Sequence, residues 1–331
     1  MTLIRNLVLT LAALSLLGAA GPAHAKNGAG PGAPATRVFT LQPDPAGNPE
    51  GIDYDRRTKA FYVSITADGA IYRGTLASDT VTPFIPGGPG KAAVGIEVHR
   101  GKLYVAGGPT GTITVYDLAT RDVVATFQTG PGGFLNDLVV TARGDVYVTD
   151  SFRPVLWHLT AAQVAAGSGT PQALDVSSGI SYEAGAFNLN GIVAKNPRRL
   201  VVVQSNTGKL FRIDLDAAGS AITSIDEVAG VNLPGGDGMI LDRGQLVVVQ
   251  GGAAPRLSFV KLRGDALQAE LRGTQTSSTL VGSSTVARAK RYYLVVNADF
   301  TNSASPPFTV AGLPARGGPK PGGDSGRRDA R

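Results

Sequence analysis

The sequence of 331 residues contains no cysteine, one tryptophan and three histidines. Without cysteine the chain can form no disulfide framework, no thiolate metal site and no cysteine nucleophile. His24 lies in a segment that we expect to be removed, which leaves only His99 and His158. A three-histidine zinc site is therefore excluded, and a Ser-His-Asp triad is disfavoured. The chemistry of the protein must rely mainly on the oxygen atoms of carboxylates, amides and hydroxyls.

Acidic residues are scarce at both ends of the chain, and this explains most of the formal net charge of +6. Residues 1–34 carry two basic residues and no acidic one, and residues 314–331 carry five basic and two acidic residues. The region between them, residues 35–313, is left with a net charge of only +1. A nucleic-acid-binding domain is expected to carry clustered Lys and Arg, so we expect no nucleic-acid partner.

The first 25 residues have the order of a secretory signal peptide. Arg5 supplies a positive charge, residues 7–17 form an apolar stretch, and residues 23–25, Ala-His-Ala, fit a small-x-small cleavage pattern. The apolar stretch is short for a bilayer span; the alternative, a membrane anchor, requires that cleavage fails. We predict a secreted or periplasmic protein, cleaved near Ala25, with no membrane span.

Glycine and proline are abundant in the segments that flank the central region. Residues 26–34 are predicted to be a flexible lead-in, and residues 314–331 a disordered basic tail. We interpret the tail as a solvated segment, with contact to an anionic cell surface as the alternative. Residues 35–313 are the predicted folded domain.

The central region repeats one arrangement of short strands six times. In each unit a first strand is followed, after turns, by a second, mostly apolar strand and then a third strand. The units start near residues 50, 95, 136, 190, 237 and 284, with spacings of 45, 41, 54, 47 and 47 residues. A period in the forties with several strands per unit is typical of a β-propeller. We predict an all-β, six-bladed propeller with at most one helical turn, at residues 164–167.

One strand near the N-terminus has no unit of its own. Residues 36–41, Thr-Arg-Val-Phe-Thr-Leu, have the composition of a strand. An incomplete last blade would leave an exposed edge. We therefore predict that this strand completes the last blade beside residues 308–310 and closes the ring.

Polar residues recur where the innermost strand of each blade begins. These first residues should converge on the mouth of the central channel, and they are Glu50, Gly95, Asn136, Asn190, Asp237 and Ser284. Four of the six carry a carboxylate or an amide, which together offer an all-oxygen site of charge −2. Such a site suits Ca²⁺, with Mg²⁺ or Mn²⁺ as alternatives. The same residues also fit ordinary turn pairs such as Asn-Gly and Asp-Gly.

Four motifs around these positions resemble those of a known family. They are Pro-Glu-Gly at Glu50, Leu-Asn-Asp at Asn136, Leu-Asn-Gly at Asn190 and Gly-Asp-Gly-Met at Asp237. They are similar to the metal-site motifs of the gluconolactonase/regucalcin (senescence-marker-protein-like) family, whose members are six-bladed propellers and in many cases lactonases. The resemblance covers about residues 37–313.

The resemblance implies roles for the same four residues. It implies that Glu50, Asn190 and Asp237 bind a divalent cation, most simply Ca²⁺, with Mg²⁺, Mn²⁺ or Zn²⁺ as alternatives. Asn136 is implied to contact the metal or the substrate, and Asp237 is implied to act also as the acid/base. The implied reaction is metal-assisted hydrolysis of a small ester or lactone: the cation polarises the carbonyl, Asp237 activates water and Asn136 orients the substrate.

The second unit departs from the family pattern. Its inner strand opens with Gly95-Ile96 where the family often has an arginine or another polar substrate-binding residue. Two hypotheses remain: an exported metal-dependent hydrolase, and a non-catalytic propeller in which a structural cation braces a ligand- or protein-binding face. We expect a monomer in either case.

Other chemistry-bearing residues have blander interpretations. His99, at a turn, and His158, in an outer strand, are expected to be surface or packing residues. Asp53 and Asp150 could support the metal site from behind, but strand-end aspartates more commonly accept hydrogen bonds from turn amides.

Overall fold

The computed structural model describes residues 34–300 and 306–315. The predicted signal peptide and most of the predicted lead-in and basic tail lie outside these residues. Within the described ranges the chain is all-β apart from two short helical segments, and neither of them has the length and apolarity needed to cross a membrane.

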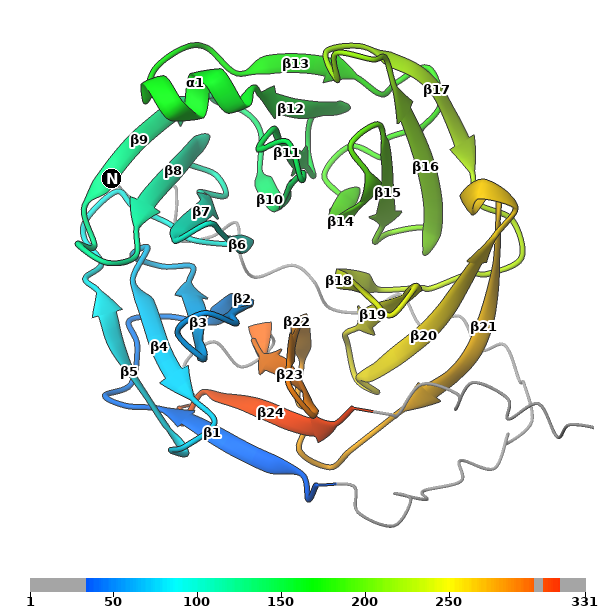
Figure 1. The fold of residues 1–331 in the computed structure, drawn as a ribbon. Coiled ribbons are helices and arrows are strands. Elements are labelled where there is room, and N and C mark those ends of the chain that lie inside the picture. The colour runs from blue at the N-terminus through cyan, green and yellow to red at the C-terminus, as the bar shows by residue number, and fades with distance from the viewer. Residues whose placement is uncertain (1–33, 301–305, 316–331) are drawn as a thin grey trace, which may run out of the picture.

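Antiparallel sheets surround a central axis in the manner of a β-propeller (Figure 1). Four sheets contain four strands each, in chain order. Their strands are β6 (Ile96–His99), β7 (Lys102–Ala106), β8 (Thr112–Asp117) and β9 (Val123–Gln128); β10 (Leu135–Val140), β11 (Val146–Asp150), β12 (Val155–Leu159) and β13 (Gln172–Asp175); β14 (Leu189–Asn196), β15 (Arg199–Gln204), β16 (Lys209–Leu215) and β17 (Ile222–Glu227); and β18 (Gly236–Asp242), β19 (Gln245–Gln250), β20 (Arg256–Arg263) and β21 (Gln268–Gln275).

An eight-stranded sheet joins the two ends of the described chain. Its order is β2 (Pro49–Asp55), β3 (Ala60–Ile65), β4 (Ile71–Thr75), β5 (Thr80–Ile85), β1 (Arg37–Leu41), β24 (Thr309–Pro314), β23 (Tyr292–Asn297) and β22 (Ser283–Ala289). The pairing predicted for residues 36–41 is present, because Phe39 of β1 lies opposite Val310 of β24 in an antiparallel ladder. A short parallel pairing of Thr40 with Thr80 connects β1 to β5.

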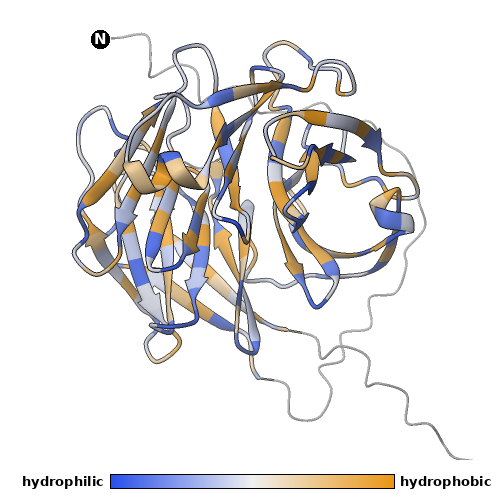
Figure 2. Ribbon diagram, turned by 45° about the horizontal axis from the view of Figure 1, so that its top comes forward, coloured by the Kyte–Doolittle hydropathy of each residue, from blue (hydrophilic) through white to orange (hydrophobic). Residues whose placement is uncertain are grey.

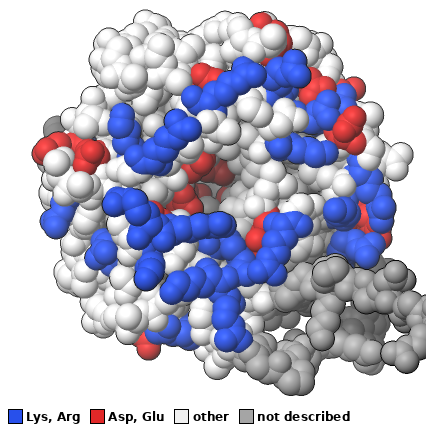
Figure 3. All heavy atoms as spheres, viewed as in Figure 1, with Lys and Arg blue, Asp and Glu red and all other residues white. Residues whose placement is uncertain are grey.

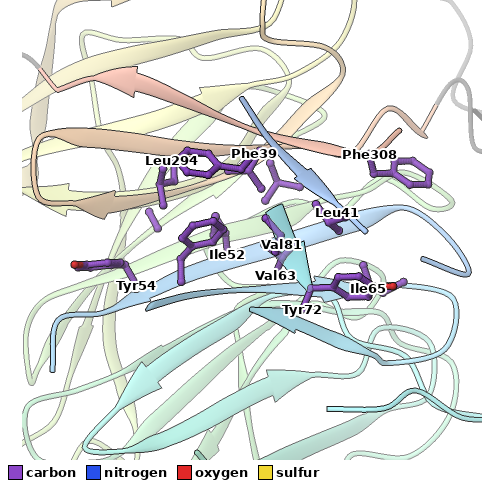
Figure 4. Close-up of a cluster of buried hydrophobic side chains, with 14 of the residues drawn as sticks. Phe39, Leu41, Ile52, Tyr54, Val63, Ile65, Tyr72, Val81, Leu294 and Phe308 are labelled. Atoms are coloured by element: carbon purple, nitrogen blue, oxygen red, sulfur yellow. The ribbon is translucent and has the colours of Figure 1, made fainter. Parts of the chain in front are cut away.

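Apolar side chains hold the two halves of this sheet together. Phe39 from β1 meets Phe61 from β3 with ring centroids 5.3 Å apart. Figure 4 shows the surrounding cluster, in which Leu41, Val63 and Leu294 come from strands far apart in the sequence. Every labelled member is almost fully buried. The N-terminal and C-terminal strands therefore share one core.

The inner strands β2, β6, β10, β14, β18 and β22 line the axis, as Figure 1 shows. Second strands such as β3 and β11 are buried along their whole length, which explains their apolar sequences, since neighbouring sheets cover both faces. Hydrophobic residues are accordingly spread over the strands of all sheets (Figure 2).

The sequence analysis missed a fourth, outer strand in the four-stranded sheets. In β9, for example, exposed and buried residues alternate only partly, and most of its residues face solvent. The helical turn expected at residues 164–167 is a longer helix, α1 (Ala161–Ala166), with Thr160 as its N-cap and Gly167, at φ 66°, as its C-cap. The second helical segment is the 3₁₀ turn η1 (Gly264–Ala266).

Candidate metal site at the mouth of the channel

The inner strands carry a bulge where the candidate ligands lie. Between Pro49 and Ile52 of β2, the two residues Glu50 and Gly51 stand opposite the single residue Ser64 of β3. The same two-against-one irregularity occurs in β10, β14, β18 and β22, and its first residues are Asn136, Asn190, Asp237 and Ser284. A bulge re-aims side chains at the end of a strand. It therefore gives these residues one common setting at the end of the axis where the inner strands begin, which we call the mouth.

The second residue of each bulge lies against the neighbouring inner strand. A Cβ atom on Gly51 would lie 2.3 Å from the Val94 carbonyl oxygen, and one on Gly191 would lie 2.3 Å from that of Asp237. Gly95 is in the same position, since its Cβ would lie 2.5 Å from the Asn136 carbonyl oxygen. Gly95 is therefore equivalent to Gly51, and the counterpart of Glu50 in the second unit is Val94. The assignment of Gly95 to the mouth was wrong by one residue.

Each of the four predicted ligands presents a buried oxygen atom that has no hydrogen-bond partner. These atoms are Glu50 Oε2, Asn136 Oδ1, Asn190 Oδ1 and Asp237 Oδ1. Unpaired buried oxygens are uncommon because losing water without a replacement partner is costly. Two carboxylates and two amide carbonyls are a donor set that a hard divalent cation would satisfy. The residues present therefore fit such an ion.

Other polar groups near the mouth form hydrogen bonds that do not involve these four oxygens. The Asn136 amide donates from Nδ2 to Ser151 Oγ at 2.9 Å, and that hydroxyl donates to the Leu189 carbonyl at 2.7 Å. One amide N–H of Asn136 is thus engaged by Ser151, while its oxygen is left open. The Ser284 hydroxyl is used differently, because it donates to the backbone carbonyl of Glu50 at 2.7 Å. Ser284 therefore positions a candidate ligand.

The two carboxylates of the site repel each other's charge. Burial is the main cause that raises the pKa of Glu50 well above its usual value, and the nearby charges of Asp237 and Asp137 raise it further. Burial also raises the pKa of Asp237 to about 7, although a hydrogen bond from the Asn190 side chain opposes the shift. Glu50, Asn190 and Asp237 are therefore close together, and the site favours the arrival of positive charge.

Three further carboxylates join neighbouring inner strands below the mouth. Asp53 accepts the backbone N–H of Val98 at 2.7 Å, and Glu97 accepts that of Val140 at 2.8 Å. Asp137 accepts the N–H of Leu138 at 2.8 Å and faces that of Ile192 at 3.4 Å. Burial raises the pKa of Asp53 to about 6 and that of Asp137 to about 7, and it raises the pKa of Glu97 well above its usual value.

Glu97 and Asp137 were not predicted to contribute to the channel. A signal for Glu97 was present, because Glu97 follows Val94 at the same interval at which Asp53 follows Glu50. The three carboxylates line a cavity of about 410 Å³ along the axis, and acidic atoms are visible inside the central hollow in Figure 3. Asp53 thus accepts hydrogen bonds from backbone amides, which is the simpler of its two predicted roles.

Asp150 also accepts hydrogen bonds from backbone amides, which is the simpler of its two predicted roles. It lies at the edge of the mouth. Its buried carboxylate accepts the backbone N–H groups of Phe134 at 2.9 Å and Phe152 at 3.1 Å, and it pairs with Arg153 at 2.7 Å. The rings of Phe134, Phe152 and Phe187 contact one another, with centroids 5.1–5.6 Å apart. All three are half-buried, and Phe134 precedes Asn136 by two residues. The sequence analysis missed this cluster because its members come from separate loops.

The histidines lie outside the mouth. His158 of β12 is 1% exposed and stacks on Tyr147 with centroids 4.7 Å apart, so it is a packing residue as expected. His99 ends β6, at the far end of that strand from the mouth. Across residues 34–300 and 306–315, no group of three or more His, Cys, Asp or Glu is arranged to hold a metal. Any cation at the mouth must therefore use the amide oxygens of Asn136 and Asn190 as well.

Comparisons with known proteins agree with the fold. No protein-family model matches the chain, and no curated protein sequence matches it. Among solved structures, a luciferin-regenerating enzyme is similar with a TM-score of 0.62 and 16% identity, over 86% of this chain and 96% of that one. Regucalcin from Agrobacterium tumefaciens, described as a calcium-binding protein, is similar with a TM-score of 0.58 and 15% identity, over 84% and 97%.

The major Malassezia sympodialis allergen Mala s 1 is a third similar structure. Its TM-score is 0.61 at 14% identity, over 84% of this chain and 95% of that one. At such identities the likeness concerns the fold. The resemblance to regucalcin-like propellers that the four motifs indicated is confirmed at that level.

Proposed function

We propose that this chain is an exported, metal-dependent hydrolase of small esters or lactones, with a divalent cation at the mouth. The observation that carries the proposal is the set of four unpaired oxygens on Glu50, Asn136, Asn190 and Asp237. We assign the cation as Ca²⁺, because all four donors are oxygens and two of them are neutral amides. The calcium-binding description of regucalcin, a structural neighbour, supports the same choice.

We further propose that the ring has six blades and is closed by β1. The eight-stranded sheet then represents two blades, β2–β5 and β22–β24 with β1, joined by the short parallel contact between β1 and β5. Six inner strands around the axis support this count (Figure 1). We propose a monomeric, secreted or periplasmic protein, on the basis of the N-terminal sequence and of a fold whose last blade is completed within the chain.

The residues of the mouth have distinct roles in the proposed reaction. When bound, the cation supplies a Lewis acid that polarises the ester carbonyl and stabilises developing negative charge. Asp237 takes the proton from the attacking water, and its carboxylate stays ionised for this step near neutral pH when the cation is bound. Asn136 acts through its unpaired oxygen, and the hydrogen bond from its amide nitrogen to Ser151 fixes the orientation of the side chain.

The phenylalanine cluster at the mouth, which we call the aromatic rim, favours apolar substrates. Phe134, Phe152 and Phe187 border the mouth beside Asn136, and the second unit contributes Val94 where a polar residue was sought. A Cβ on Gly108 would lie 2.9 Å from Val94 Cγ2 and 3.5 Å from Phe134 Cζ, so these two apolar side chains adjoin. An alkyl or aryl ester would bury apolar surface there, whereas a polyhydroxylated sugar lactone would lose hydrogen bonds with water.

Calcium binding and ester hydrolysis test the proposal together. We expect the protein to bind Ca²⁺ by calorimetry and to hydrolyse aryl esters or apolar lactones in an EDTA-sensitive way. Asp237→Asn and Glu50→Gln, which preserve shape and remove charge, should abolish both. Glu183→Gln, an exposed carboxylate of the loop before β14, is the matched control and should change neither.

Two outcomes would contradict parts of the proposal. If Ca²⁺ binds and the two variants lose it, but no ester or lactone is hydrolysed, the chain is the non-catalytic propeller with a structural cation. If no divalent cation binds, the assignment of the four oxygens to a metal site is wrong.

A further inference from the structure

Basic side chains gather on the face opposite the mouth. The inner strands begin at the mouth, so the turns that connect them to the second strands lie at the other end of the axis. Figure 3 shows Lys and Arg surrounding the central hollow on this face. Each of the six turns contributes at least one exposed basic residue; taking one from each, these are Arg56, Arg100, Arg143, Arg198, Arg243 and Lys290. We call this set the basic rim.

Acidic residues near these turns are withdrawn from the surface. Asp55, Asp145 and Asp242 are 7–8% exposed. Asp242 contacts both Tyr293 and Arg288, and Asp55 accepts the Thr58 hydroxyl and the backbone N–H of Arg57. The six turns, all of which the structure describes, carry no exposed carboxylate; the exposed Asp122 and Asp265 of this face lie in outer turns, between third and fourth strands. The near-neutral net charge of residues 35–313 concealed this clustering.

Several rim residues adopt a backbone conformation that favours other residue types. Arg100, Arg243 and Lys290 have φ between 50° and 51°. Lys59, which shares the first turn with Arg56, has φ 59°. Glycine and asparagine are the usual residues at such positive φ values. Long cations at these sites place charge at the tips of the turns at some cost in backbone energy, and such costs tend to occur where function requires them.

The end of the described chain lies on the same face. The Ala315 N–H donates to the carbonyl of Arg291, which belongs to the turn between β22 and β23. The last described residue, Ala315, therefore lies beside the rim, and the sequence after it, residues 316–331, carries five basic and two acidic residues.

We propose that the basic rim docks the protein onto an anionic phospholipid surface, with the mouth directed away from it. The tips of six turns that end on one face fit a flat surface of phosphate groups, and each Lys or Arg near such a surface adds to binding. An open cleft of about 690 Å³ between the first two turns offers room for a headgroup; its lining includes Arg56, Arg57 and Arg100 as well as Asp53 and Asp55.

A lipid surface suits the rim better than a nucleic acid does. Binding of single-stranded nucleic acid relies on aromatic side chains that stack on bases. The tyrosines next to these turns, Tyr54, Tyr292 and Tyr293, are buried or half-buried, so none of them presents an exposed ring for stacking.

Vesicle co-sedimentation of the full chain tests the proposal. We expect binding to vesicles of phosphatidylcholine containing a quarter phosphatidylglycerol, little binding to phosphatidylcholine alone, and loss of binding at high salt. The triple variant Arg56→Gln, Arg198→Gln, Lys290→Gln should weaken binding about tenfold or more. A matched triple variant with the same charge change away from the rim, Lys91→Gln, Lys209→Gln, Arg272→Gln, should bind like the wild type.

The outcomes separate the proposal from its competitors. Equal binding to both vesicle types, or equal weakening by the two triple variants, would overturn it. Binding to heparin or DNA without binding to the anionic vesicles would identify a soluble polyanion instead and would also overturn it. Thermal melting of both variants checks that the fold is intact, so that lost binding reports on the rim.

Discussion

The Thr149 hydroxyl donates to the backbone carbonyl of Asn190 at 2.8 Å and accepts the backbone N–H of Asp137 at 3.0 Å. One side chain of a second strand thus connects the bulges of β10 and β14, each of which carries a candidate ligand. Ser64 has the same place two sheets earlier in the ring, where it accepts the Gly51 N–H and donates to the Val94 carbonyl. Hydroxyls opposite the bulges of β2 and β10 therefore tie each of these bulges to the next inner strand.

Thr149→Val should weaken both the fold and the metal site. Valine has the same shape as threonine but leaves a buried N–H and a buried carbonyl unpaired, which costs about 1–3 kcal/mol for each group. We expect a lower free energy of unfolding in urea and weaker Ca²⁺ binding. Thr149→Ser keeps the hydroxyl and should preserve Ca²⁺ binding. Identical Ca²⁺ affinity in the valine variant and the wild type would refute the role of this bridge.

Asp53→Asn should change how stability depends on pH. The pKa of Asp53 in the folded protein is about 6, mainly because of burial, against an ordinary value of 3.8. The folded protein therefore keeps this proton at pH values where the unfolded chain has lost it. Stability contributed by Asp53 is fully present below about pH 4 and is lost as the pH rises through about 6.

Asparagine carries no charge to bury and can still accept one of the two backbone N–H groups, from Val98 and Tyr54, that Asp53 accepts. We expect Asp53→Asn to be more stable than the wild type at pH 8, by up to about 3 kcal/mol, and to differ little from it at pH 4. Urea titrations at both pH values measure this difference. Nearby Glu97 and Asp137 also titrate, so the comparison is between variant and wild type at each pH. A stability difference that is the same at both pH values would contradict the prediction.

Gly191→Ala should disrupt the mouth by a steric clash. Its Cβ would lie 2.3 Å from the Asp237 carbonyl oxygen and 3.1 Å from Met239 Cγ, and a backbone atom at such a distance cannot simply rotate away. We expect a loss of stability of roughly 1–3 kcal/mol or more and loss of stabilisation by Ca²⁺ in thermal melting. Gly88→Ala is the control, because its nearest neighbour would be Lys91 Cε at 3.7 Å. A Gly191→Ala protein with unchanged melting and calcium response would rule out this close packing.

The sequence predicts the candidate ligands better than it predicts their surroundings. Glu50, Asn136, Asn190 and Asp237 interrupt otherwise apolar inner strands at the same point of each unit, and a polar residue in an apolar pattern is visible without a structure. The displacement between Gly95 and Val94 was not visible, because a bulge sets two residues against one. Spacing alone does not tell which of the two side chains reaches the mouth.

The missed elements share a physical cause. Outer strands such as β9 are exposed on much of their surface, so their sequences lack the apolar pattern that marks a buried strand. The basic rim was not visible in the sequence for a related reason. The net charge of residues 35–313 sums all faces of the domain, and only the fold shows that basic residues gather on one of them. The cluster of Phe134, Phe152 and Phe187 depends on contacts between loops, and no local pattern announces such contacts.

Calcium binding should release protons near neutral pH. The pKa of Asp237 is raised to about 7 and that of Glu50 is raised well above its usual value, so without the cation the site holds protons at pH 6.5. Ca²⁺ must displace these protons, and its apparent affinity should fall as the pH is lowered below about 7. Calorimetry in buffers of different ionisation enthalpy measures the release. Binding without proton release at pH 6.5 would show that these carboxylates are not the ligands.

Phe187→Ser should reduce the preference for apolar esters. Its ring contacts both Phe134 and Phe152, and removing it opens the aromatic rim and takes apolar surface away from a bound alkyl or aryl group. We expect kcat/KM to fall about tenfold or more for an ester with a long-chain acyl group and to change little for the acetate ester of the same alcohol. Val123→Ala, at an exposed position of β9, is the control. An equal loss for both esters would indicate damage to the metal site, whereas no loss for either would show that substrates do not contact the rim of the mouth.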